Sequence, residues 1–313
     1  MYAVIPTHNR LAHTLACLAC LEQQDYAPLE VVVVDDGSTD GTSAAVASEF
    51  PRVTVLRGNG RLWWTGSMAM GVRHVRCRCS LDDYILCQNN DTLFSPDYVS
   101  TLVRVSRKGG GALVGSVLRS WDDGALISVG PKITWGRPDI CDLQRIVDEP
   151  EVLCRDEIVD SLEALSGRGT LVPIRVFRRV GNFRRILLPH YIADYEFSAR
   201  AKRRGERLLV STRAVVYTAP PTPRPSAPAD IRSMLHMFFS RRSSTNLICH
   251  LIFFAVSGPP RKRPAAIVRM LRGAARTVRG VLRASPTRPP RAGRCEARSD
   301  SGGDRVSPRT SKR

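Results

Sequence analysis

The sequence predicts an α/β fold with a mostly parallel, doubly wound sheet that is flanked by helices. Two observations support this expectation. The N-terminal third alternates apolar strands with helical patterns, at the roughly 30 residues per strand–helix unit that a doubly wound sheet produces. The second strand contains four consecutive valines, residues 31–34. Such an uninterrupted β-branched run is typical of a parallel strand buried on both faces.

The order of the expected elements follows from apolar periodicity and from turn and cap signals. Strands are expected at residues 2–5, 29–34, 53–56, 83–87, 112–118, 171–174 and 208–217. Helices are expected at residues 11–24, 42–49, 68–78, 95–106 (with Ser95 as N-cap) and 190–204, with a helical turn at 176–180. Residues 137–165 are weakly patterned, and only a short helix near 156–165 is expected there.

Positive charge is concentrated in the C-terminal part of the chain. From Ile231 onward there are 19 Lys and Arg against 3 Asp and Glu, whereas the preceding residues carry 28 against 26 and are nearly neutral. This asymmetry indicates an anionic partner, either a membrane surface or nucleic acid. We expect the α/β domain at residues 1–218, a Pro-rich linker at 219–229, a helical extension at 230–284 and a disordered basic tail at 285–313.

Within the extension, residues 264–284 form a strongly amphipathic pattern. One helix face carries Arg269, Arg272, Arg276, Arg279 and Arg283, and the other carries Ile267, Leu271, Ala274, Val278, Val281 and Leu282. A basic amphipathic helix of this kind favours a place in a membrane interface. The alternative is a helix that packs its apolar face on its own protein. The longest apolar run, residues 246–257, is shorter than the roughly 20 residues that span a bilayer.

The nine cysteines indicate a reducing compartment, because their number is odd and no secretory signal precedes the first strand. Cys17 and Cys20 have redox or metal spacing, but they lie in an apolar helical pattern without a second pair at zinc spacing. Core packing is therefore the favoured role for these two thiols.

Polar side chains follow two strands of the predicted sheet, at the point where each strand ends. Asp35 and Asp36 follow the valine strand, and Asn90 and Asp91 follow the strand at residues 83–87. Ligands of open α/β sheets bind at the carboxyl ends of the strands. The alternative for the first pair is a plain polar turn, with Asp40 or Thr42 capping the next helix.

A glycine-rich loop, residues 58–67, precedes the helix expected at Met68 and contains the adjacent residues Trp63 and Trp64. Glycines before a helix N-terminus suit a diphosphate, because free amides and the helix dipole point there. The loop lacks the Gly-Lys-Ser/Thr ending of a P-loop. We interpret the paired tryptophans as a wall of a binding site, although a core role would also account for them.

Together these motifs resemble inverting family 2 glycosyltransferases of the GT-A (Rossmann-like) fold, over about residues 2–218. The segments that carry the resemblance are residues 4–9, 33–42, 89–92 and 188–196. Residues 63–68 and 238–246 look like a bacterial rhamnosyltransferase-like subgroup, whose tails sit on membranes.

The resemblance implies roles for individual residues. Asp91 would bind a divalent cation, Mg²⁺ or Mn²⁺, that bridges the donor diphosphate, and Asp194 would be the general base, with Glu196 as a second candidate. The expected contacts to the nucleotide-sugar are Pro6, Asn9, Asp36, Gly60, Arg61, Trp64 and Asn90.

The chain also departs from the family pattern at three places. Asn89 and Asn90 precede Asp91, Ala193 replaces a Glu before the expected base, and Thr218 stands where many relatives place a metal-binding His. These departures predict a weaker or more hydrated metal site.

The expected function is inverting transfer of a sugar, with rhamnose favoured, from a nucleotide-sugar to a hydroxyl of a cell-envelope glycan or lipid-linked acceptor. We expect a cytoplasmic protein held peripherally at the inner face of the cell membrane. The alternatives are a nucleotidyltransferase and a catalytically degenerate protein that binds sugar nucleotides. Nucleic-acid binding by the tail is a less favoured expectation.

Overall fold

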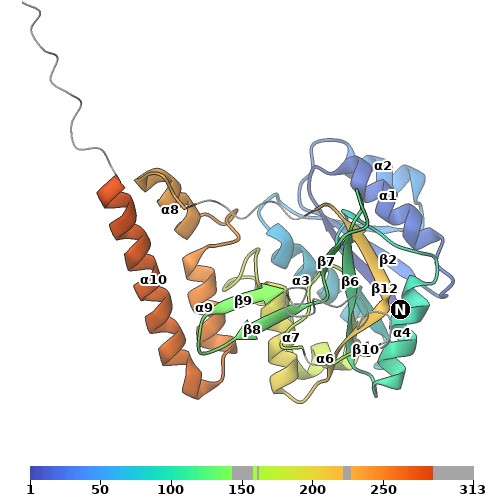
Figure 1. Ribbon diagram of the computed structural model, residues 1–313. Coiled ribbons are helices and arrows are strands. Elements are labelled where there is room, and N and C mark those ends of the chain that lie inside the picture. The colour runs from blue at the N-terminus through green and yellow to red at the C-terminus, as the bar shows by residue number, and fades with distance from the viewer. Residues whose placement is uncertain (143–157, 161, 221–226, 285–313) are drawn as a thin grey trace, which may run out of the picture.

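The computed structural model describes residues 1–142, 158–160, 162–220 and 227–284 (Figure 1). The middle of the expected linker, the whole expected basic tail and most of the weakly patterned segment lie outside the described residues. The expected helix near residues 156–165 is wrong where it can be checked, because residues 158–159 form a strand and residues 162–165 are not helical.

The main sheet is mixed and contains ten strands among the described residues. Its strands are β1 (Tyr2–Thr7), β2 (Glu30–Asp35), β3 (Thr54–Arg57), β4 (Tyr84–Cys87), β5 (Thr92–Leu93), β6 (Leu113–Ser120), β7 (Leu126–Ser128), β10 (Ile158–Val159), β11 (Thr170–Pro173) and β12 (Leu208–Thr218). A separate antiparallel hairpin is formed by β8 (Pro131–Thr134) and β9 (Asp139–Asp142).

The strand order is β10-β12-β6-β11-β4-β1-β2-β3, with β5 paired to β12 and β7 paired to β6. The neighbours β4, β1, β2 and β3 run parallel, and so do β6 and β12. Strand β11 is antiparallel to both β4 and β6. The prediction of a parallel sheet therefore holds for β4, β1, β2 and β3, which β11 joins to the other half. In that half β6 and β12 are parallel, but β5, β7 and β10 pair antiparallel with them.

Helices cover both faces of this sheet, so the central strands are buried on both sides. The helices of the α/β part are α1 (Leu11–Glu22), α2 (Thr42–Glu49), α3 (Trp63–Arg76), α4 (Tyr98–Lys108), α6 (Ile174–Val180) and α7 (Ala193–Arg203). On β1, Val4 faces the core that contains α3, α6 and α7, whereas Ala3 and Ile5 face the core that contains α1, α2 and α4.

Four helix starts differ from the prediction. Helix α7 begins at Ala193 rather than at residue 190, and α6 begins at Ile174 rather than at residue 176. Helix α3 begins at Trp63 rather than Met68, so the glycine-rich loop is shorter than expected and both tryptophans lie in the first helical turn. The N-cap of α4 is Asp97 and not Ser95. The Ser95 hydroxyl instead donates to the Asp97 carboxylate at 2.5 Å.

The C-terminal helices α8 (Ile231–Phe239), α9 (Leu247–Ser257) and α10 (Arg263–Ala284) pack together, with α10 at the outer edge of the molecule (Figure 1). Part of the apolar face of α10 is covered by its own chain: Ala266 and Met270 lie in a cluster with Phe253 and Phe254, and Val281 packs with Met234 and Phe238, whereas Leu271 and Leu282 stay exposed. The membrane-interface interpretation of this face is therefore not supported. Among the described helices, none is long and apolar enough to cross a membrane.

Candidate functional site

The candidate site lies where β1, β2 and β4 end, at one edge of the parallel half of the sheet. Asn90, in the turn after β4, links β1 and α1 at this edge. Its buried amide nitrogen donates to the Thr7 hydroxyl at 3.1 Å and to the Thr14 hydroxyl at 3.0 Å. These bonds join the end of β1 to α1, so the predicted donor contact Asn90 has a positioning role in this structure.

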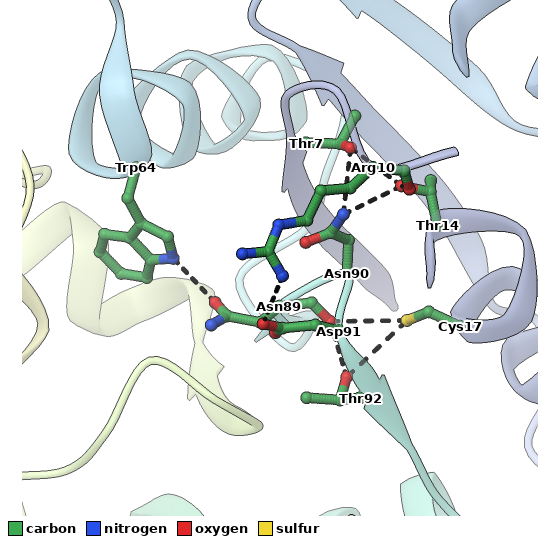
Figure 2. Close-up of polar contacts among 9 residues, drawn as sticks. All are labelled: Thr7, Arg10, Thr14, Cys17, Trp64, Asn89, Asn90, Asp91 and Thr92. Atoms are coloured by element: carbon green, nitrogen blue, oxygen red, sulfur yellow. Dashed lines mark hydrogen bonds and ion pairs between the residues drawn. The ribbon is translucent and has the colours of Figure 1, made fainter. Parts of the chain in front are cut away.

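The neighbouring residue Asn89 is held by hydrogen bonds to its side chain and to its backbone carbonyl (Figure 2). The Trp64 indole N–H donates to the Asn89 side-chain oxygen at 2.8 Å, and the Cys17 thiol donates to the Asn89 carbonyl at 3.5 Å. Burial raises the pKa of Cys17 to about 12, so this thiol stays neutral, as the expected packing role requires. Trp64 thus acts from α3 as a clamp on the turn that carries Asp91.

Asp91 has one paired and one unpaired carboxylate oxygen. Its Oδ2 lies 3.1 Å from a guanidinium nitrogen of Arg10, which reaches across from the end of β1 (Figure 2). Its Oδ1 is buried, and no group in the described part of the chain donates a hydrogen bond to it. A buried carboxylate oxygen without a partner is costly unless another ligand completes it.

A divalent cation fits this oxygen. Mg²⁺ typically takes one or two carboxylates and completes its shell with water and substrate phosphates. Across the described residues, no cluster of three or more His, Cys, Asp or Glu side chains could hold a metal alone. Thr218, at the end of β12, pairs with Thr92 beside Asp91, and its neutral hydroxyl adds no charge. The residues therefore fit a cation shared with a diphosphate better than a resident ion.

Asp36 holds the glycine-rich loop. One carboxylate oxygen accepts from the Gly60 N–H at 2.8 Å, and the other accepts from the Trp63 N–H at 2.9 Å, at the start of α3. Gly37 has φ +72°, and a Cβ there would lie 2.9 Å from the Gly60 nitrogen. Both carboxylate oxygens of Asp36, which was predicted to contact the nucleotide, are thus engaged in holding this loop. Asp35 is buried and accepts from the Ser38 N–H at 2.8 Å, as expected for packing at the strand end.

Replacing Asp36 by Ala should loosen the loop. We expect the free energy of unfolding to fall by about 2 kcal/mol, because two buried charge-assisted hydrogen bonds are lost. Chemical denaturation measures this loss. Arg61→Ala changes an exposed side chain of the same loop and should leave stability unchanged. An unaltered unfolding curve for Asp36→Ala would show that the loop does not depend on this carboxylate.

The predicted contacts Asn9 and Pro6 lie at the same edge. Asn9 accepts from the Thr39 N–H at 2.7 Å and has φ +49°, which holds the turn after β1 against the turn after β2. Pro6 is buried within β1, opposite Val34. The N-cap of α2 is Gly41, and not Asp40 or Thr42 as the plain-turn alternative expected. The Asp40 side chain still accepts from the Thr42 N–H at 3.1 Å, in the first turn of α2.

Asp194 lies in the first turn of α7, half-buried, next to the Trp64 ring. Its Oδ2 accepts from the Gly167 N–H at 2.7 Å, and its Oδ1 accepts from the Tyr195 N–H at 3.0 Å. A Cβ at Gly167 would overlap the Trp64 ring and would lie 3.3 Å from the Asp194 Cβ. Only a glycine lets these side chains meet. Burial raises the pKa of Asp194, which makes its carboxylate a better proton acceptor.

Glu196 does not belong to this site. Its carboxylate is fully buried and lies 2.9 Å from the Arg200 Nε and 3.4 Å from a guanidinium nitrogen of Arg184. The guanidinium of Arg200 also donates to the Asn182 carbonyl at 3.0 Å. A catalytic role for Glu196 is therefore not supported, because an internal ion pair occupies its carboxylate.

His190 was not predicted as a site residue, although it lies in the segment that carries the resemblance. Its ring is 5.5 Å from the Trp63 ring, and its buried Nδ1 has no hydrogen-bond partner among the described residues. Burial lowers the pKa of His190, so the imidazole is neutral near pH 7. Trp63 (φ 57°) and Ile192 (φ 66°), which lie next to His190 in space and in sequence, respectively, both have left-handed backbone angles. Such backbone angles are a signal that sequence alone does not display.

Trp121 marks the other side of Asp91. Its ring stacks on His13 at 5.7 Å, and both rings line a cavity of about 180 Å³ that also contacts Asp91. Aromatic side chains together with a few placed polar groups are typical of the lining of small-molecule sites.

Comparison with known proteins agrees with this geometry. Residues 2–150 match the glycosyl transferase family 2 model. Over 102 residues the chain is 32% identical to an uncharacterized glycosyltransferase of Haemophilus influenzae, and this match spans about a third of each protein.

The fold is shared with solved structures of low sequence identity. These include mannosyltransferase PcManGT from Pyrobaculum calidifontis in complex with GDP-Man and Mn²⁺ (TM-score 0.55, 21% identity, 91% of this chain and 76% of that one). They also include GalNAc-T7 with UDP, GalNAc and Mn²⁺ (0.56, 13%, 75% and 47%) and S. aureus TarS 1-349 in complex with UDP (0.52, 12%, 88% and 72%). Residues 2–150 are thus similar to a glycosyl transferase family 2 domain, and the chain shares an α/β fold of the GT-A type with these solved structures.

Proposed function

We propose that this protein transfers a sugar from a nucleotide-sugar donor to an acceptor hydroxyl. One observation carries the proposal: an acidic residue suited to a cation, Asp91, and a half-buried carboxylate, Asp194, are joined through Trp64. That indole bonds to Asn89 on one side and lies against Gly167, the hydrogen-bond donor to Asp194, on the other. One site therefore offers a cation ligand for the departing diphosphate and a carboxylate that can act as the base.

In this proposal each residue has a separate task. Asp194 takes the proton from the acceptor hydroxyl as the new glycosidic bond forms, and a single in-line displacement inverts the anomeric carbon. A bound Mg²⁺ or Mn²⁺ would supply charge neutralisation for the departing diphosphate. Asp91 would hold that ion, and the loop fixed by Asp36 would position the nucleotide.

The finer features of the proposal rest on the chain's composition and resemblance. We propose rhamnose as the sugar and a cell-envelope glycan or lipid-linked molecule as the acceptor. The basic C-terminal helices support an anionic surface nearby, so we propose that the protein works at the inner face of the cell membrane.

The donor is the feature to test first. Thermal-shift measurements with a panel of UDP-, GDP- and dTDP-sugars in the presence of Mg²⁺ should reveal one nucleotide that raises the melting temperature well above the others. Product formation with that donor then tests transfer. If no sugar nucleotide binds at millimolar concentration, the proposed function is wrong.

Asp91→Asn tests the cation. The amide keeps an acceptor for Arg10 but loses the charge, so the Mn²⁺ concentration for half-maximal donor binding should rise by about tenfold or more. A Mn²⁺ titration of donor binding measures this shift. Asp122→Asn is the matched control, since Asp122 is an exposed carboxylate of the turn beside Trp121. Equal titrations for the two variants would remove the metal role from Asp91.

A further inference from the structure

The C-terminal helices carry charge that the proposed chemistry does not use. We define the C-terminal module as residues 231–284, which contain eleven Lys and Arg and no Asp or Glu. Seven large apolar side chains of the module are also exposed: Ile231, Leu235, Phe239, Ile248, Val268, Leu271 and Leu282. Cationic and apolar surface therefore occur together on one small unit.

A groove of about 650 Å³ lies between α8, α9, α10 and the turn of the β8–β9 hairpin. Phe238, Leu247 and Met270 form apolar parts of its lining, and each also packs in a hydrophobic cluster of the module. The groove therefore has a firm apolar wall.

The other lining of the groove is cationic. Arg269 donates to the Gly136 carbonyl at 2.5 Å, which fixes the hairpin turn to α10. Arg137, Arg272 and Arg276 also line the groove, and within the described residues no ion pair joins any of them to a carboxylate. Three guanidinium groups that line one groove without an ion-pair partner attract an anion. The planar guanidinium matches a phosphate through two parallel hydrogen bonds.

The groove is connected to the candidate active site through a single helix. His250 of α9 lines the groove, whereas Cys249 and Ile252 of α9 pack with Leu188, Ala193 and Trp64. Ala193 directly precedes the proposed base. A ligand held in the groove would therefore lie beside the helix that forms one wall of the base's surroundings.

We propose that this groove binds the phosphorylated part of an amphiphile, a glycosyl phosphate or diphosphate ester of a long apolar chain, and that the sugar of this molecule carries the acceptor hydroxyl. An inorganic anion would not contact the apolar wall favourably, and an uncharged lipid would not pair with the arginines. The inference rests on the proposed glycosyl transfer for the word acceptor, but the binding site itself does not.

Calorimetric titration of the full chain with dodecyl phosphate, below its critical micelle concentration, tests the site. The variant Arg272→Glu/Arg276→Glu should weaken binding by at least about tenfold. The matched control Arg279→Glu/Arg283→Glu makes the same charge change on exposed residues of the same helix that do not line the groove. It should bind like the unaltered protein. Circular dichroism and melting temperature confirm that both variants are folded.

Three results would overturn the groove assignment. Equal losses in both double variants would show a diffuse electrostatic field. Binding of inorganic phosphate as tight as that of dodecyl phosphate would show a simple anion site. Binding of dodecanol with the same affinity would show a purely apolar one.

Donor binding separates this inference from the proposed function. Arg272→Glu/Arg276→Glu should leave donor affinity unchanged, because the groove lies outside the donor site. If the unaltered protein binds dodecyl phosphate in the groove but no sugar nucleotide, then glycosyl transfer is wrong and the lipid-phosphate site stands. If donor binds and dodecyl phosphate does not, the groove assignment is wrong and the proposed function stands.

Discussion

Asp194→Asn should lower kcat for sugar transfer by roughly 10³- to 10⁴-fold, the range expected for loss of a positioned general base. The amide is isosteric and still offers an oxygen to the Gly167 N–H, so the site should keep its shape. Donor affinity, measured by calorimetry, should therefore change little. A variant that transfers sugar at the normal rate would remove Asp194 from the chemistry.

The pH dependence of transfer gives a second measure of the same residue. Because burial raises the pKa of Asp194, the carboxylate needed as base forms at a higher pH than for an ordinary Asp. The acidic limb of the kcat profile should lie correspondingly high. Folding favours the protonated form, and that stabilisation is full below the ordinary pKa and is lost as the pH rises through the raised one. Asp194→Asn should therefore increase the melting temperature at neutral pH while it abolishes the acidic limb.

Glu196→Ala should cost about 3–5 kcal/mol of unfolding free energy, because it leaves the Arg200 guanidinium charged and buried without its partner. Both groups are almost inaccessible to solvent, so water cannot replace the lost interaction. Urea denaturation followed by circular dichroism measures the effect.

Arg184→Ala is the matched control. It removes the outer, 41% exposed partner of the same carboxylate, and should cost about 1 kcal/mol or less. If Glu196→Ala were instead stable within about 1 kcal/mol and inactive, then Glu196 would be catalytic after all. The two outcomes differ in which measurement changes.

The long strands β1, β2, β3, β4, β6, β11 and β12 could be predicted because each is an apolar run that ends in a turn signal, and the edge of the sheet that carries Asp36 and Asp91 followed from strand direction. The short strands β5, β7, β8, β9 and β10 were not predicted. The start of α3 could not be predicted either. The N–H of Trp63 is satisfied by Asp36, 27 residues earlier, and a cap supplied across the sheet leaves no local pattern. The same distance in sequence hid the structural task of Asp36.

Side-chain partners were harder to predict than elements. The spacing of Glu196 and Arg200 is that of a helical i,i+4 ion pair, a signal present in the sequence that points to a structural role. The amphipathy of α10 was equally plain, but periodicity shows only that an apolar face exists. It does not tell whether a bilayer or the helices α8 and α9 cover that face.

The placement of the four tryptophans makes the molecule its own optical reporter. Trp63, Trp64 and Trp121 surround the turn and helix that carry Asp91 and Asp194, while Trp135 stacks on Phe253 beside the hairpin turn at the groove. Intrinsic fluorescence excited at the indole band therefore arises from two separate regions. With Trp135→Phe the emission comes only from the three tryptophans near Asp91 and Asp194, and the difference from the unaltered protein comes from Trp135 beside the groove, without any dye or tag.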